Sequence, residues 1–118
     1  MNFESVQSYI LPVGLIAFFA YRFYKFYSIK KLLPKLVEEG AIIVDVRSST
    51  EFKSAANPKS INIPLDQINS GSKKLDKNKT IVVCCASGTR SGMALGILKK
   101  NGFKKVVNAG PWTNTMTA

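Results

Sequence analysis

The stretch TIVVCCASGTRS, residues 80–91, decides the fold of this chain. Its opening residues are mostly apolar and β-branched, which predicts a buried strand over Thr80–Cys84. A short polar loop containing Gly88 follows. Apolar residues at helical spacing then predict a helix over Ser91–Asn101 that begins near Arg90. We therefore expect a strand, a tight loop and a helix in direct succession.

The same alternation continues on both sides of this stretch. Apolar, β-branched runs predict further strands at 41–46, 61–63 and 105–108, with Gly110 and Pro111 ending regular structure. Helical patterns are expected at 28–39, where Pro34 would start a second helix, at 48–54, which opens with a Ser-Ser-Thr-Glu capping pattern, and as one turn at 65–69. Residues 71–79 are expected to form a lysine-rich loop. Alternating strands and helices indicate an α/β fold with a small, mainly parallel sheet flanked by helices.

An apolar segment precedes this domain. Seventeen consecutive residues, Ser5–Tyr21, carry no charge, and a helix of that length is ~26 Å long, the lower limit for crossing a bilayer core. Arg22 and Lys25 follow among aromatic residues, as is typical of a membrane–water interface. We predict a membrane-anchor helix at 1–28 and the α/β domain at 29–118. A helix that lies in the interface or packs on the protein is the alternative, because the segment is short and contains Pro12.

The charges around this segment predict its orientation. No basic residue precedes it and Glu4 is acidic, which argues against a cleavable signal peptide. The basic residues follow it: Arg22, Lys25, Lys30, Lys31 and Lys35. By the positive-inside rule the N-terminus lies outside and the domain is cytoplasmic.

Composition excludes several classes of function. The 118 residues carry a formal net charge of +10 and contain no histidine. Cysteine–histidine nucleophile pairs and histidine metal sites are thereby excluded, and no metal or other cofactor is expected. No nucleic-acid-binding motif accompanies the positive charge, so no nucleic-acid partner is expected. Cys84 and Cys85 are adjacent, which does not suit a disulfide framework and favours a reducing compartment.

The loop after the strand at 80–84 has the features of an anion site. Backbone N–H groups at a helix start, with a curved loop before them, form a cradle for negative charge. Gly88 allows backbone conformations that other residues avoid, and Arg90 adds a forked cationic donor. A cysteine facing this cradle should have a pKa below the free value of about 8.5.

Four segments together resemble the rhodanese family over residues 32–112. Residues 81–91 are similar to its active-site segment, Cys-x-x-Gly-x-Arg-Ser after a strand. Residues 43–52, IVDVRSSTEF, resemble its Asp-Val-Arg-x-x-x-Glu-Phe segment, and residues 60–64, SINIP, resemble its Ala-Ile-Asn-Ile-Pro strand. Residues 107–112, VNAGPW, resemble its closing segment.

The resemblance implies sulfur transfer through a persulfide on Cys85. The donor would be a small anion such as thiosulfate or a low-molecular-weight persulfide, and the acceptor a thiol or cyanide. The loop that binds substrate would comprise Ala86, Ser87, Gly88, Thr89, Arg90 and Ser91. The oligomeric state is not addressed by any pattern in the chain.

Cys84 offers a second register. Counted from Cys84, the loop fits the Cys-x5-Arg-Ser pattern of cysteine phosphatases and arsenate reductases. A strand that ends at Cys84 favours Cys85 as the nucleophile, because it leaves Cys84 in the core. A non-enzymatic docking domain on a membrane anchor is a third alternative.

Asp45, Arg47 and Glu51 are open to two interpretations. They could form a paired-carboxylate site or a structural ion-pair network at the end of a strand. The network is the favoured interpretation, with Arg47 the member expected nearest the substrate.

Overall fold

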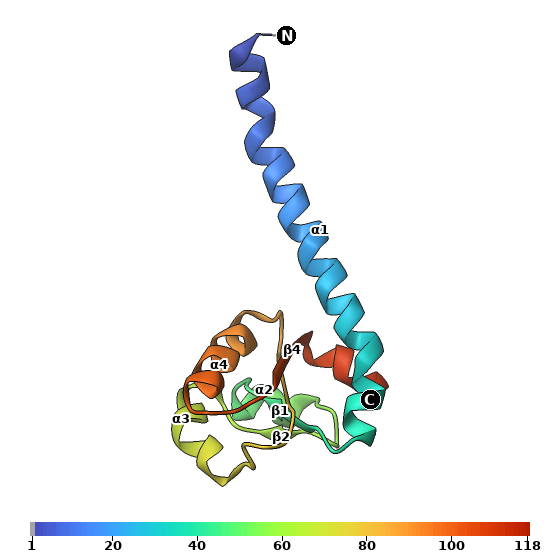
Figure 1. Ribbon diagram of the computed structural model, residues 1–118, viewed down its shortest axis with the longest axis vertical. Helices are drawn as coiled ribbons and strands as arrows, with labels where there is room; N and C mark the ends of the chain where they lie inside the picture. Colours follow the sequence, from blue (N-terminus) through green and yellow to red (C-terminus); the bar gives the residue numbers. More distant parts are fainter. Residues whose placement is uncertain (1) are drawn as a thin grey trace.

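The computed structural model describes residues 2–118 (Figure 1). A long helix, α1 (Phe3–Glu38), projects from a small α/β body and gives the molecule extents of 59 × 30 × 27 Å. The Asn2 side chain caps this helix by accepting a hydrogen bond from Ser5 N at 2.8 Å. No residue of its apolar half is buried within the protein.

The expected break at Pro34 is wrong, because α1 passes through both Pro12 and Pro34 as one helix of 36 residues. A proline inside a helix removes one backbone hydrogen bond. Here Leu33 and Leu36, on either side of Pro34, are buried against the sheet. This packing holds both sides of the proline in helical register, and tertiary contacts thus override local preference.

The sheet has four strands in the order β2 (Ile61–Asn62), β1 (Ile42–Asp45), β3 (Ile81–Cys85) and β4 (Val106–Pro111). All neighbouring pairs are parallel. The α/β class with a small parallel sheet flanked by helices is therefore confirmed.

Helices cover both faces of the sheet. The C-terminal part of α1 and the 3-10 helix η3 (Trp112–Thr117) cover one face, where the core contains Leu33, Leu36 and Cys84. Helices α3 (Ile68–Gly71) and α4 (Thr89–Lys100) cover the other face, where the core contains Ile68 and Cys85. Since side chains alternate along a strand, the two adjacent cysteines of β3 belong to opposite cores.

The remaining helices are short. Helix α2 (Ser49–Ser54) follows β1 and has the predicted capping box, in which Ser48 and Glu51 satisfy each other's backbone N–H groups. The 3-10 helices η1 (Leu65–Gln67) and η2 (Ser72–Lys74) flank α3. The loop predicted over 71–79 is therefore partly helical, because Ile68 and Ser72 are buried and bring this segment against α4.

Two strands extend beyond their predicted ends. Strand β3 includes Cys85, which pairs with Pro111 at the end of β4. A register shift between Val83 and Cys84, with Gly110 at φ +75°, lets the two strands continue together. From the sequence, Gly110 and Pro111 were expected to end the strand, but pairing with β3 keeps this segment extended.

The strands run back along α1 towards its free half. Ala41 N, just before β1, donates to Leu36 O at 2.9 Å, whereas Gly110 near the end of β4 contacts the Phe26 ring. Ten residues of helix, ~15 Å, separate these two levels. The carboxyl edge of the sheet therefore lies on the same side as the apolar half of α1, as the direction of β4 in Figure 1 shows.

Candidate active site

The Cys85 sulfur lies at the start of α4. Its Sγ accepts hydrogen bonds from Gly88 N at 2.9 Å and from Ser91 N at 3.5 Å, and lies 3.4 Å from Ser91 Oγ. The side chain is fully buried. Backbone N–H groups at a helix N-terminus carry positive partial charge, so this position favours a thiolate.

Gly88 shapes the loop around the sulfur. It caps α4 with φ +102°, a left-handed conformation that side chains disfavour. A Cβ at this position would also lie 2.7 Å from the Phe26 ring and 3.1 Å from Gly110 Cα. Both the backbone angle and the space require glycine, which directs the Gly88 N–H at Sγ.

The pKa of the Cys85 thiol is lowered despite burial. Burial opposes ionisation, but hydrogen bonds from the Ser91 side chain and from the backbone N–H groups of Ser91 and Gly88 outweigh it. The predicted anion cradle thus acts on this sulfur through the backbone and Ser91.

Asn108 is a site residue that the sequence did not single out. Its Nδ2 donates to Gly88 O at 3.1 Å, and its Oδ1 accepts from Gly110 N at 2.9 Å and from Ser91 Oγ at 2.7 Å. The amide thereby joins β4 to the loop and to the residue beside the sulfur. A polar residue at the end of an apolar strand was the only signal in the sequence.

Arg90 is engaged by α2. Its Nη1 and Nη2 donate to the two Glu51 carboxylate oxygens at 2.6 and 3.0 Å, and both side chains are more than a third exposed. The Arg90 hydrogen bonds and the Ser48 backbone lower the pKa of Glu51 to about 2. The bidentate pair fixes the first turn of α4 to α2.

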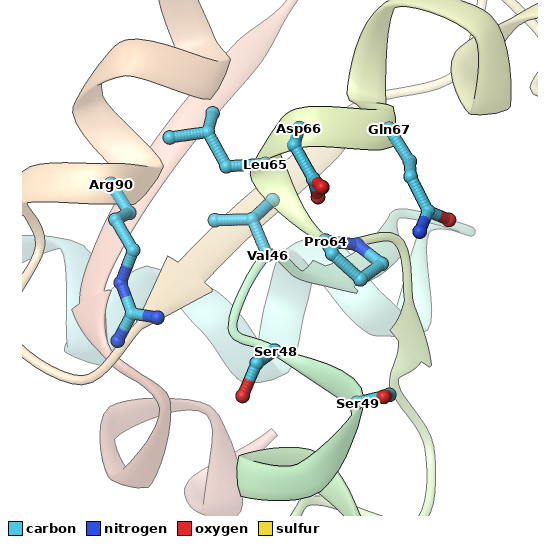
Figure 2. A pocket seen from close by; sticks show the side chains of 8 residues that line it. All are labelled: Val46, Ser48, Ser49, Pro64, Leu65, Asp66, Gln67 and Arg90. Atoms are coloured by element: carbon cyan, nitrogen blue, oxygen red, sulfur yellow. The ribbon is translucent and has the colours of Figure 1, made fainter.

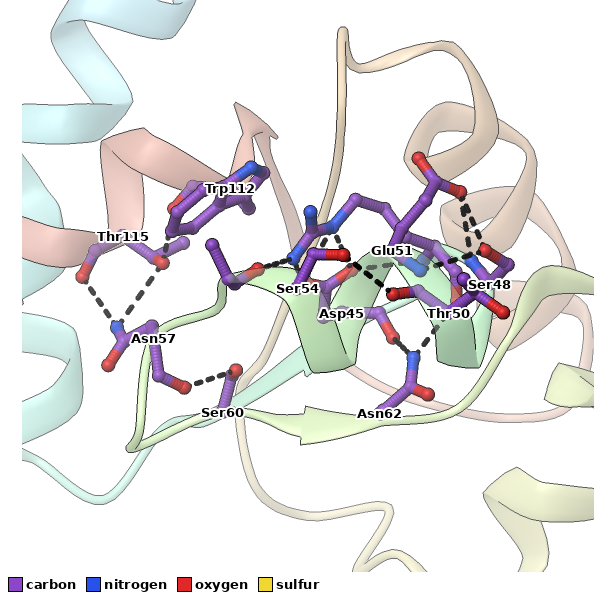
Figure 3. A network of polar contacts seen from close by, with 12 residues as sticks. Asp45, Ser48, Thr50, Glu51, Ser54, Asn57, Ser60, Asn62, Trp112 and Thr115 are labelled. Carbon is purple, nitrogen blue, oxygen red and sulfur yellow. Dashed lines mark hydrogen bonds and ion pairs between the residues drawn. The ribbon is translucent and has the colours of Figure 1, made fainter.

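Asp45 and Arg47 form a separate, buried pair. Arg47 Nη2 lies 2.8 Å from Asp45 Oδ2 and donates to Ala55 O at 2.7 Å, and its guanidinium lies 4.7 Å from the centre of the Trp112 ring. Asp45 and Trp112 are both labelled in the polar network of Figure 3. Only 5% of Arg47 is exposed. The expected network is thus two pairs, and Arg47 lies beneath Trp112 instead of at the surface. This favours a structural role.

Cys84 faces away from the loop. Its side chain packs with Leu33, Leu36 and Ile43 in the core beneath α1. Burial, followed by the nearby Asp45 charge, raises the pKa of its thiol. The end of the strand does not separate the two cysteines, because β3 contains both; the alternation of side chains separates them.

Open surface lies around the buried sulfur. Ala86, Ser87 and Thr89 are exposed on the loop. A cavity of about 480 Å³ opens beside Arg90, between α2 and η1, and its lining includes Ser48, Ser49 and Asp66 (Figure 2). The loop is therefore reachable from solvent next to the Arg90–Glu51 pair.

The model of the rhodanese-like domain family matches residues 29–110 of this chain. The chain therefore belongs to the rhodanese family. Its relatives are sulfurtransferases and sulfur carriers, so sulfur transfer between a donor and a thiol acceptor is the chemistry of the family.

Relatives from bacteria illustrate the similarity. The chain is 37% identical over 71 residues to the thiosulfate sulfurtransferase GlpE of Pseudomonas savastanoi, covering 60% of this chain and 67% of that one. It is 36% identical over 69 residues to the thiosulfate sulfurtransferase PspE of Escherichia coli, covering 57% and 66%. Three other curated relatives, from Bacillus subtilis, Schizosaccharomyces pombe and Allochromatium vinosum, are spanned over only 43, 63 and 65% of their lengths.

Solved structures show the same fold. A structure of an E. coli rhodanese with anions superimposes with a TM-score of 0.58 at 32% identity, covering 64% of this chain and 91% of the other. The Bacillus anthracis protein CoADR-RHD gives a TM-score of 0.64 at 30% identity, covering 74% of this chain and 15% of the other.

Proposed function

We propose that this protein is a membrane-anchored sulfurtransferase that moves sulfane sulfur through a persulfide on Cys85. The observation that carries the proposal is the surroundings of Sγ: two backbone N–H groups and the Ser91 hydroxyl surround one sulfur at a helix start. The donor is thiosulfate or a low-molecular-weight persulfide, and the acceptor is a thiol, or cyanide in an assay.

The reaction is a double displacement. The Cys85 thiolate attacks the outer sulfur of thiosulfate, a new S–S bond forms, and the S–S bond of thiosulfate breaks. Sulfite leaves with the electron pair. An acceptor thiolate then attacks the outer sulfur of the Cys85 persulfide, forms its own S–S bond and releases the Cys85 thiolate. No external oxidant or reductant enters, because each step exchanges one sulfur–sulfur bond for another.

The loop residues have distinct roles in this proposal. The N–H groups of Gly88 and Ser91 stabilise the Cys85 thiolate before it attacks the donor, and again when the acceptor has taken the sulfur from it. Arg90 is a positioning residue. Its charge is compensated by the ion pair with Glu51, and this pair holds the loop to α2. Ala86, Ser87 and Thr89, which are exposed, contact the incoming donor.

The membrane part of the proposal rests on α1. This helix is long and apolar enough to cross a bilayer, and its apolar half projects from the body with none of its residues buried (Figure 1). The basic residues after Tyr21 favour an outside N-terminus and a cytoplasmic domain. The helix continues without interruption across the proposed boundary at residue 28, so the anchor joins the domain without a flexible linker.

Persulfide formation on the two cysteines tests the proposal. The purified protein is incubated with thiosulfate, freed of excess donor, and its cysteine-containing peptide is analysed by mass spectrometry. We expect one added sulfur that cyanide removes, absent in Cys85→Ala and retained in Cys84→Ala. Added sulfur in the Cys85→Ala variant, or none in the wild type, would refute the proposal.

Two further readouts address the alternatives. Hydrolysis of an aryl phosphate that is lost in Cys84→Ala and kept in Cys85→Ala would establish a phosphatase instead. A folded wild type without persulfide or phosphatase activity would indicate a docking domain.

A further inference from the structure

A groove runs between α1 and α4 beside the candidate active-site loop. It consists of two adjacent cavities of about 430 and 320 Å³, which share Lys25 and Asn108 in their linings. The first reaches Gly88 and Thr89 of the loop, and the second extends to the start of β4. The rhodanese match begins at residue 29, so the α1 residues before Ile29 that line the groove lie outside the matched domain.

The charge of this groove has one sign. Arg22, Lys25, Lys99 and Lys105 line it, and neither lining contains an aspartate or glutamate. Lys25, Lys99 and Lys105 line the same smaller cavity, from three different segments of the chain. Cations converging without a compensating carboxylate attract an anionic occupant.

The groove is also apolar, and it opens towards the free half of α1. Phe18 and Tyr21 form its upper end, and they belong to the last turn of the uncharged helix segment Ser5–Tyr21. An occupant with an anionic group and an apolar chain fits this groove, because lysines line one end of it and the apolar half of α1 continues from the other end. A free anion would leave the apolar upper end without a partner.

Two residues that line the groove, Arg22 and Phe26, directly contact the loop. Arg22 Nη2 donates to Ser87 O at 3.4 Å, and the Arg22 guanidinium lies 5.4 Å from the centre of the Phe26 ring. Phe26 in turn contacts Gly88 and Gly110. Because the carboxyl edge of the sheet faces the apolar half of α1, the loop and the end of the groove that contains Phe18 both face the expected bilayer surface.

We propose that this groove binds an anionic phospholipid, with the phosphate among Lys25, Lys99 and Lys105 and an acyl chain along α1 past Phe18. The inference rests on the membrane anchoring proposed above. The bound lipid links α1 to α4 beside the loop that contains Cys85. An acidic peptide of a partner protein has the charge but does not match the apolar surface that continues up α1.

Lipid binding to the full chain in detergent tests this proposal. Native mass spectrometry follows retention of phosphatidylglycerol against phosphatidylcholine with matched acyl chains. The groove variant is Lys25→Gln, Lys99→Gln and Lys105→Gln combined. The control combines Lys73→Gln, Lys74→Gln and Lys79→Gln, which makes the same charge change on exposed lysines of the segment between α3 and β3.

We expect the wild type to prefer phosphatidylglycerol by about ten-fold or more, and the groove variant to lose at least about ten-fold of this binding, since the three lysines supply the charge that attracts the lipid phosphate. The control should stay within about two-fold, and the matched Lys→Arg triple variant should retain binding, because it keeps the charge. Equal loss in groove variant and control, or equal retention of both lipids, would overturn the proposal.

Competition experiments define the occupant. Glycerol 3-phosphate should fail to displace the lipid at equal concentration, and so should an acidic peptide; displacement by either overturns the lipid assignment. The measurement of lipid retention does not depend on sulfur transfer. Selective retention in a protein that forms no persulfide would therefore refute the proposed function alone, and persulfide formation without selective retention would refute this inference alone.

Discussion

The Ser91 hydroxyl has one proton and two acceptors within reach, Asn108 Oδ1 at 2.7 Å and Cys85 Sγ at 3.4 Å. In the thiol form the shorter contact holds the proton, and the Cys85 S–H can donate to Ser91 Oγ. When the thiol ionises, the hydroxyl gains a charged acceptor, and hydrogen bonds to charged groups are stronger. Ser91 is therefore a residue that responds to the ionisation of Cys85.

Replacing Ser91 by alanine should raise the pKa of Cys85, because it removes the side-chain hydrogen bond that lowers it. The thiolate predominates above the pKa, so the pH profile of persulfide formation should move to higher pH while the alkaline plateau is kept. At neutral pH we expect a loss of up to about ten-fold, the equivalent of about 1.4 kcal/mol for one hydrogen bond to a charged group. Stopped assays across pH measure this.

Ser70→Ala, an exposed serine in α3, is the matched control. A Ser91→Ala profile that coincides with the wild type at every pH would show that Ser91 does not act on the thiolate. The nucleophile and the glycine were predictable from sequence at this scale, because a local pattern of strand, loop and helix carries them. Asn108 was not, because its role depends on the loop from β3 lying beside β4, a contact between segments 17 and 20 residues apart.

At the scale of elements, the Arg90–Glu51 pair joins the first turn of α4 to the first turn of α2. The replacement Glu51→Gln removes the carboxylate charge but keeps a residue that suits the third position of a capping box. The pKa of Glu51 is lowered to about 2 in the folded protein, against about 4.3 for an unperturbed glutamate. A lowered folded pKa stabilises the fold above the unfolded value and ceases to do so as pH falls through the folded value.

We therefore expect Glu51→Gln to lower Tm at pH 7 by at most a few degrees, because the pair is partly exposed and screened by solvent. The difference from the wild type should shrink below about pH 4 and vanish near pH 2. Thermal unfolding at several pH values checks this, with Glu38→Gln, an exposed residue outside both ion pairs, as control. A constant difference down to pH 2 would contradict the assigned ion pair.

The capping box of α2 and the parallel sheet were predictable, because short-range chemistry and hydrophobic patterns determine them. The continuity of α1 through Pro34 and the extension of β3 to Cys85 were not, because burial of Leu33 and Leu36 and pairing with Pro111 determine them. The choice between Cys84 and Cys85 shows the same limit. The sequence argument relied on where the strand ends, whereas the side of the sheet separates the two thiols.

At the scale of the whole molecule, α1 is both the proposed anchor and part of the wall of the candidate active site. Phe26 packs on Gly88 and Gly110, and Arg22 reaches Ser87 O. The family match begins at residue 29, so it excludes the α1 residues that make these contacts. The functional unit should therefore begin before the domain boundary that sequence similarity suggests.

Two shortened chains test this boundary. A chain beginning at Arg22 should remain in solution, fold, and form the Cys85 persulfide at the rate of the full chain, because residues 2–21, which it lacks, are all exposed. A chain beginning at Ile29 loses the Phe26 ring and should be less stable by about 1–2 kcal/mol, the value for uncovering a half-buried aromatic side chain. It should also form the persulfide more slowly, since Gly88 loses its cover. Urea unfolding followed by the fluorescence of Trp112, the single tryptophan, measures the stability.

Within the full chain, Phe26→Ala should reproduce the loss, and Phe23→Ala should not, because Phe23 is 75% exposed and lies against Tyr27. Equal stability and equal rates for the chains beginning at Arg22 and Ile29 would show that residues 22–28 contribute neither to the stability of the domain nor to the reactivity of Cys85. If the rates differ as expected, the segment between the apolar half of α1 and the rhodanese domain couples the position of that half to the geometry around Cys85. Bending of α1 would then displace Gly88 through the Phe26 ring.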